Sequence, residues 1–209
     1  MTNRLLVSCR RIVSLGILSV LPAAFAWAGA LNVTVVDEQG RPLPEAVVFL
    51  ESPEAGRAVK PMSGAEMAQK DKAFQPGVLV VTRGTLVSFP NQDTVRHHVY
   101  SFSPAKRFEL KLYIGRPANP VLFDQPGVVV LGCNIHDQMV AWVVVVDTPY
   151  HATTAADGTV ALKEVPPGNY RLHVWHSRLP VGAPAWQQPR KIGANAASVT
   201  VTLNGVAAQ

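Results

Sequence analysis

Residues 127–147 read GVVVLGCNIHDQMVAWVVVVD, two apolar runs separated by a short polar loop. Continuous apolar runs that are rich in β-branched residues and bounded by Gly or Asp are typical of central β-strands. The loop places Cys133, His136 and Met139 three residues apart, directly after the first run. In an extended strand the first two would point to opposite faces, whereas a tight loop can turn all three toward one point. We therefore predict a β-sheet protein whose loop carries the functional residues.

Further strand segments precede this stretch. Each of them is apolar and is bounded by Gly, Pro, Asn or Asp. They predict an all-β sandwich that includes the two runs above. The segment 52–74, which comes before all of these strands, is expected to be a loop that has room for one short helix. The segments are VLVVT (78–82), TLVSF (85–89), HHVYSF (97–102), FELKLY (108–113) and PVLF (120–123).

The two ends of the chain have a different residue pattern from the middle. Residues 31–50, LNVTVVDEQGRPLPEAVVFL, contain two apolar segments around a turn at Gly40 to Pro44. This pattern predicts an antiparallel hairpin over residues 29–51. Residues 149–209 are rich in turns and include a T-x-x-x-G segment and a Pro-Gly-x-Tyr corner.

Both ends resemble parts of a carboxypeptidase regulatory-like, or transthyretin-like, sandwich. This resemblance implies a second, small Ig/transthyretin-like β-sandwich, built from residues 29–51 and 149–209. The middle sandwich, residues 52–148, is then inserted into the second one. A single sandwich with decorated ends is the alternative.

The first 28 residues have the composition of a secretory signal peptide. Arg4, Arg10 and Arg11 precede an apolar stretch and then small residues. Without this leader, 16 of the 19 basic residues remain against 14 acidic ones, so nothing in the charge favours nucleic acid. Cys9 lies in the leader, which leaves Cys133 as the one cysteine of the mature chain. Exported proteins normally use cysteines in pairs, so a lone one is buried, bridged to another chain or bound to metal.

Of these three possibilities for Cys133, the residues that surround it in the loop favour metal binding. A Cys thiolate with two imidazoles and a weak axial thioether is the donor set that selects copper and supports cycling between Cu(I) and Cu(II). Closed zinc sites seldom use a thioether. One short loop cannot surround an ion, so a second histidine must come from elsewhere, and His97 and His98 are the candidates. If both are extended, only one can point inward.

Residues 75–147 resemble a cupredoxin of the plastocyanin and amicyanin kind. That family combines an N-x5-H segment, here Asn91 to His97, with a C-x-x-H loop and a Met. The resemblance implies a Greek-key sandwich with one mononuclear copper near one end, bound by His97, Cys133, His136 and Met139, with His98 as the substitute for His97. The family usually has Pro and Asn on either side of the first ligand histidine, whereas this chain has Arg96 and His98.

The whole chain also resembles exported bacterial proteins labelled methylamine utilisation proteins, in segments such as HHVYSFSPAKRFELKLY and GVVVLGCNIHD. We therefore expect a periplasmic, or otherwise exported, type 1 (blue) copper protein that carries single electrons. A c-type cytochrome or a periplasmic dehydrogenase is the expected redox partner. No membrane span is expected once the leader is removed. The alternative is a copper-binding or copper-delivery module without a carrier role.

An enzyme is not expected, because copper oxidases and nitrite reductases need further metal sites. Six histidines with no H-x-H pair provide little material for them. His173 and His176 lie three apart on a predicted strand, so they face opposite sides and are poor co-ligands. We interpret them, and His151, as structural. Trp142 and Trp175 sit in apolar strand patterns and are expected in the core.

Overall fold

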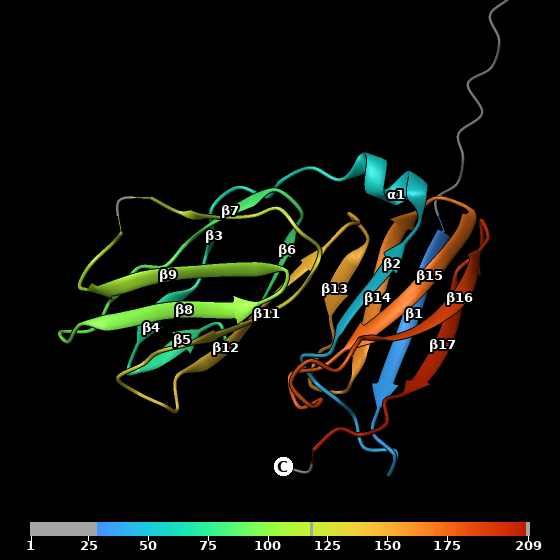
Figure 1. Ribbon diagram of the computed structural model, residues 1–209. Helices are drawn as coiled ribbons and strands as arrows, with labels where there is room; N and C mark the ends of the chain where they lie inside the picture. The colour runs from blue at the N-terminus through green and yellow to red at the C-terminus, as the bar shows by residue number, and fades with distance from the viewer. Residues whose placement is uncertain (1–28, 118, 208–209) are drawn as a thin grey trace, which may run out of the picture.

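The computed structural model describes residues 29–117 and 119–207. These residues form almost entirely β-strands, arranged as two sandwiches that lie side by side (Figure 1). The predicted all-β fold class is confirmed. The predicted signal peptide at 1–28 lies outside the described residues. In the part of the chain that is described, no helix has the length and apolarity to cross a bilayer.

The middle sandwich has a larger sheet in the order β6-β12-β11-β8-β9 and a smaller sheet in the order β10-β7-β3. A separate hairpin, β4-β5, completes it. Each of the seven segments predicted as strands between residues 78 and 147 contains one. The strands are β3 (Ala65–Glu66), β4 (Ala68–Lys70), β5 (Ala73–Gln75), β6 (Val78–Thr82), β7 (Thr85–Ser88), β8 (His97–Ser103), β9 (Lys106–Tyr113), β10 (Val121–Phe123), β11 (Gly127–Gly132) and β12 (Val140–Val146).

The continuous apolar run of β12 is explained by burial on both faces. Val143 and Val145 point into the core of the middle sandwich. Val144 and Val146 point the other way, into a second apolar cluster. This cluster is shared with the second sandwich, which both ends of the chain form and which is called the outer sandwich. A strand that is covered on both faces has no polar positions, which is the pattern of a central strand.

The outer sandwich has one sheet in the order β14-β1-β17 and one in the order β13-β2-β15-β16. Their facing side chains form one apolar core. In β1 burial alternates, because one face of the strand packs on this core and the other is partly open. The strands are β1 (Gly29–Val36), β2 (Val47–Glu51), β13 (His151–Thr153), β14 (Thr159–Val165), β15 (Gly168–Trp175), β16 (Trp186–Ile192) and β17 (Ala197–Thr202).

The predicted hairpin over residues 29–51 is wrong. β1 pairs with β14 and β17, whereas β2 pairs with β13 and β15 in the facing sheet. The segment between them therefore crosses from one sheet to the other. Leu43 and Ala46 in this segment are completely buried in the outer core. A hairpin would keep both strands in one sheet, on one side of the core. A connection that crosses between the sheets can place its own side chains in the core as well.

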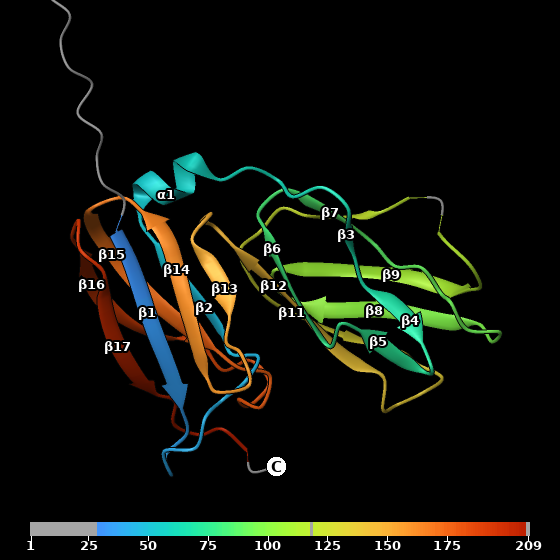
Figure 2. The ribbon, with the colours of Figure 1, turned by 180° about the vertical axis from the view of Figure 1, so that it is seen from behind.

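The chain leaves the outer sandwich after β2 and returns to it at β13 (Figure 2). The outgoing connection contains helix α1 (Pro53–Ala58), which Ser52 caps by accepting a hydrogen bond from the Ala55 N–H, 3.1 Å. The exact domain boundaries predicted from the sequence stay predictions.

An apolar cluster joins the two sandwiches. Phe49 and Trp175 of the outer sandwich pack with Val144 of β12, and half-buried Trp142 packs against them. The ring centroids of Trp142 and Trp175 lie 6.2 Å apart. Both tryptophans are thus interior to the joint rather than to either sandwich core.

Candidate metal centre

His97 opens β8 at the end of the middle sandwich that lies away from the outer sandwich (Figure 1). Its side chain is 0% exposed. Its Nε2 lies 2.7 Å from Oδ2 of Asp93, whereas its Nδ1 is buried without a hydrogen-bond partner. One ring nitrogen is therefore occupied by a carboxylate, and the other is free.

Cys133 and His136 lie in the loop that follows β11. The loop is tight, because the Met139 N–H donates to the His136 carbonyl at 2.9 Å and the Val140 N–H donates to the Gln138 carbonyl at 3.0 Å. Cys133 is buried, and His136 is partly exposed. The Nδ1 of His136 is also buried without a hydrogen-bond partner. This is the tight turn that the spacing of the loop required.

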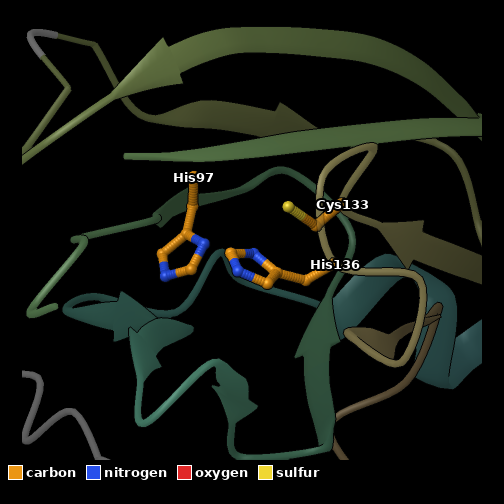
Figure 3. Close-up of side chains that lie close together, drawn as sticks. All are labelled: His97, Cys133 and His136. Carbon is orange, nitrogen blue, oxygen red and sulfur yellow. The ribbon is translucent and has the colours of Figure 1, made fainter. Parts of the chain in front are cut away.

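His97, Cys133 and His136 come together although His97 and Cys133 are 36 positions apart in the sequence. Their ligand atoms all lie within 4.8 Å of one another, and the three side chains point toward a common centre (Figure 3). The two imidazole rings have centroids 5.0 Å apart. Buried ring nitrogens normally have partners. Two orphaned Nδ1 atoms beside a buried thiol therefore fit a metal ion, and these three residues could hold one.

Met139 is 1% exposed and packs in the same apolar core as Cys133. Met139 lies at the end of the loop that follows β11, residues 133–139, which is called the ligand loop. This place is compatible with the predicted axial role, which stays a prediction. The family-based preference for His97 is consistent with the geometry. His98, next along β8, is also buried, with its Nε2 2.9 Å from Oε1 of Glu109 and its Nδ1 without a partner, but it is not among the residues that converge.

Asp93 is a residue of this site that the sequence reasoning missed. Its Oδ1 accepts the Asp71 N–H at 2.7 Å, and its Oδ2 accepts the Lys72 N–H at 2.9 Å. Although burial acts to raise it, the pKa of Asp93 is lowered, because the Lys72 N–H, His97 and the Asp71 N–H together stabilise the carboxylate. An acidic residue four positions before His97 was the available signal.

A second layer of hydrogen bonds lies beside the thiol. The Tyr113 hydroxyl donates to the Phe89 carbonyl at 2.6 Å and accepts from the Gln69 amide. Burial raises the pKa of Tyr113 to about 12, and the nearby Cys133 acts in the same direction, against the effect of the Gln69 hydrogen bond. Tyr113 is therefore a neutral donor at physiological pH.

The remaining histidines lie elsewhere. His173 stacks on Phe49 with ring centroids 4.7 Å apart and lies 3.1 Å from Glu51. His176 contacts the Pro44 carbonyl at 3.0 Å. These contacts agree with the structural roles expected of them.

A groove of about 1040 Å³ lies between the sandwiches. Its walls include Tyr100, Trp142 and the segment 179–185, but none of His97, Cys133 or His136. Tyr100 pairs with Gly132, directly before Cys133, and its ring occupies the space over that glycine. The groove is thus separated from the three converging side chains.

No family model matches the chain, and no curated protein matches it. Among solved structures it is similar to a purple cupredoxin from Nitrosopumilus maritimus, with 22% identity over 39% of this chain and 99% of that one, TM-score 0.35. It is also similar to a variant of amicyanin in its reduced Cu(I) form, with 20% identity over 47% of this chain and 98% of that one, and a TM-score of 0.36. A third similar structure, a copper-containing nitrite reductase from Thermus scotoductus, is 22% identical over 55% of this chain and 28% of that one, with a TM-score of 0.37. Each likeness covers only part of this chain.

Proposed function

We propose that this chain is an exported type 1 copper protein that carries single electrons between redox partners. The observation that carries the proposal is the convergence of a buried thiol with two imidazoles whose Nδ1 atoms have no other partner. Thiolate and imidazole donors suit copper, and thiolate in particular suits Cu(I). When bound, the copper would supply a one-electron couple between Cu(I) and Cu(II).

The residues around the site would hold its geometry constant during electron transfer. His97 is fixed by a carboxylate, and the ligand loop is held by two backbone hydrogen bonds and by buried Met139. A preorganised set of donors needs little rearrangement when the charge of the ion changes. This favours a carrier over a site that must open to release its metal.

The surface near the site suits brief contact with a partner. His136 is partly exposed, and its neighbour Ile135 is 46% exposed. By resemblance to cupredoxins, the exposed edge of His136 is the electron exit. A c-type cytochrome or a periplasmic dehydrogenase is the proposed partner, and the predicted leader agrees with an exported location.

The test is to add Cu(II) to the purified protein without its leader and to record the visible spectrum beside that of Cys133→Ser. The parent should develop a thiolate-to-copper charge-transfer band, and the variant should have none. Absence of the band in the folded parent would refute copper ligation by Cys133. Reversible voltammetry and rapid electron exchange would support the carrier role, whereas slow redox cycling with fast loss of copper to an acceptor apoprotein would contradict it.

A further inference from the structure

Among the contacts between a basic side chain and a carboxylate in the described chain, that of His97 with Asp93 is the most enclosed: the histidine is 0% exposed, the aspartate side chain is 14% exposed, and the Nε2 to Oδ2 distance is 2.7 Å. A carboxylate oxygen only accepts hydrogen bonds, so the imidazole must donate from Nε2. A neutral imidazole with its proton on Nε2 has its lone pair on Nδ1. The free lone pair is then on the nitrogen that has no partner in the protein.

The carboxylate is itself held in place. The β4-β5 hairpin turns at Asp71 and Lys72, which both have positive φ, 55° and 56°. Two successive N–H groups of this turn point at Asp93, one to each carboxylate oxygen. The Asp93 N–H donates to Oδ1 of Asn91 at 3.0 Å. Asn91 in turn donates to the carbonyls of Val95 and Tyr113 at 2.8 and 2.9 Å.

We propose that Asp93 is a positioning residue of the metal site, which fixes the tautomer and ring orientation of His97 and is held by the turn of the β4-β5 hairpin. This inference rests on the proposed function for its copper-dependent part. Metal-binding histidines are commonly oriented in this way by a partner on the other ring nitrogen, and loss of that partner typically costs about 10- to 100-fold in metal affinity.

The charge of Asp93 has a second effect. A fixed negative charge beside a ligand stabilises the ion of higher charge more than the ion of lower charge. Asp93 therefore stabilises Cu(II) relative to Cu(I) and lowers the reduction potential. Replacement by Asn keeps an oxygen that can accept from His97 and removes the charge.

The test compares Asp93→Asn with Asp37→Asn. Asp37 is a matched control in the outer sandwich, because its carboxylate also accepts two backbone N–H groups, from Gln39 and Arg41, and one side-chain donor, from Arg41. Asp93→Asn should raise the reduction potential, and Asp93→Ala should also lower copper affinity by about 10- to 100-fold. Asp37→Asn should change neither. A potential and affinity unchanged in the folded Asp93 variants would overturn the proposal.

A second measurement needs neither copper nor a variant. Nitrogen-15 NMR of the metal-free parent, labelled in histidine, should find the His97 proton on Nε2. A proton on Nδ1 would refute the assigned tautomer even if copper binds. Conversely, a parent that shows the Nε2 tautomer but no copper band would refute the proposed function and leave the Asp93–His97 arrangement standing.

Discussion

His97 and His98 are adjacent in β8, yet they bind different carboxylates: His97 lies 2.7 Å from Asp93 and His98 lies 2.9 Å from Glu109. Successive side chains of a strand point to opposite faces. Only His97 reaches the centre that Cys133 and His136 share. The face of the sheet that encloses the thiol therefore favours His97 over His98 as the candidate ligand.

We expect His97→Gln to abolish the thiolate-to-copper band and to lower copper affinity by more than the ~10- to 100-fold typical of a lost outer-shell partner. His98→Gln, the matched control from the same strand, should keep the band at full intensity. Titration with Cu(II) followed by visible absorption measures both. An intact band in His97→Gln, or its loss in a folded His98→Gln, would mean that the ligand has been misassigned.

Met139→Leu tests the axial ligand with little damage to the core. Exchange of one buried side chain for another of similar volume usually costs less than about 1.5 kcal/mol, so the fold should persist. The thiolate band should remain, since Cys133 is untouched. The reduction potential should rise, because Cu(II) loses more than Cu(I) when a weak donor is removed, and the axial ligand tunes this potential. Voltammetry of parent and variant is the measurement, and equal potentials would exclude an axial role for Met139.

Trp175→Ala should weaken the joint between the sandwiches. Trp175 is 3% exposed and packs against Trp142 and Val144 of the middle sandwich. Removal of a buried Trp side chain costs roughly 3–5 kcal/mol of unfolding free energy. Urea denaturation should show this loss, whereas Val181→Ala, at a side chain that is 78% exposed, should change stability little. A loss below about 1 kcal/mol for Trp175→Ala would show that the joint contributes little.

Acidification should destabilise the outer sandwich in a window that begins near pH 6.5. Burial lowers the pKa of His151 and of His176 below the ordinary histidine value of about 6.5, so the folded state favours the neutral rings. The unfolded chain then binds protons first as the pH falls, and the stability present above pH 6.5 is lost below it.

Thermal melts of the metal-free protein from pH 7.5 to 5.5 measure this dependence. The melting temperature should be level at the upper end and should fall below pH 6.5. His151→Gln should flatten the curve, because one of the two contributing groups is gone. The carboxylates with lowered pKa, such as Glu51, lose their contribution only in a more acidic range. A flat profile across the window would contradict the prediction.

Much of the strand pattern could be predicted because local rules suffice for it. The runs that became β11 and β12 are apolar throughout and end at turn residues, and they occupy central positions in the sheet. The hairpin over 29–51 failed for the converse reason. Two apolar segments around a turn look the same in the sequence whether they pair in one sheet or face each other across a core. The strand pairing distinguishes the two arrangements, and the burial of Leu43 and Ala46 agrees with it.

By itself, the sequence predicted three candidate donors in the loop after β11, since Cys133, His136 and Met139 are close along the chain and only a tight turn can bring them together. It also narrowed the distant ligand to His97 or His98. Only the tertiary structure decided which of these faces the thiol, and only it placed Asp93 on Nε2 of His97. The reason is physical: the orientation of a ring depends on what packs on each side of its strand, and that is set by segments such as the β4-β5 hairpin, more than twenty residues away.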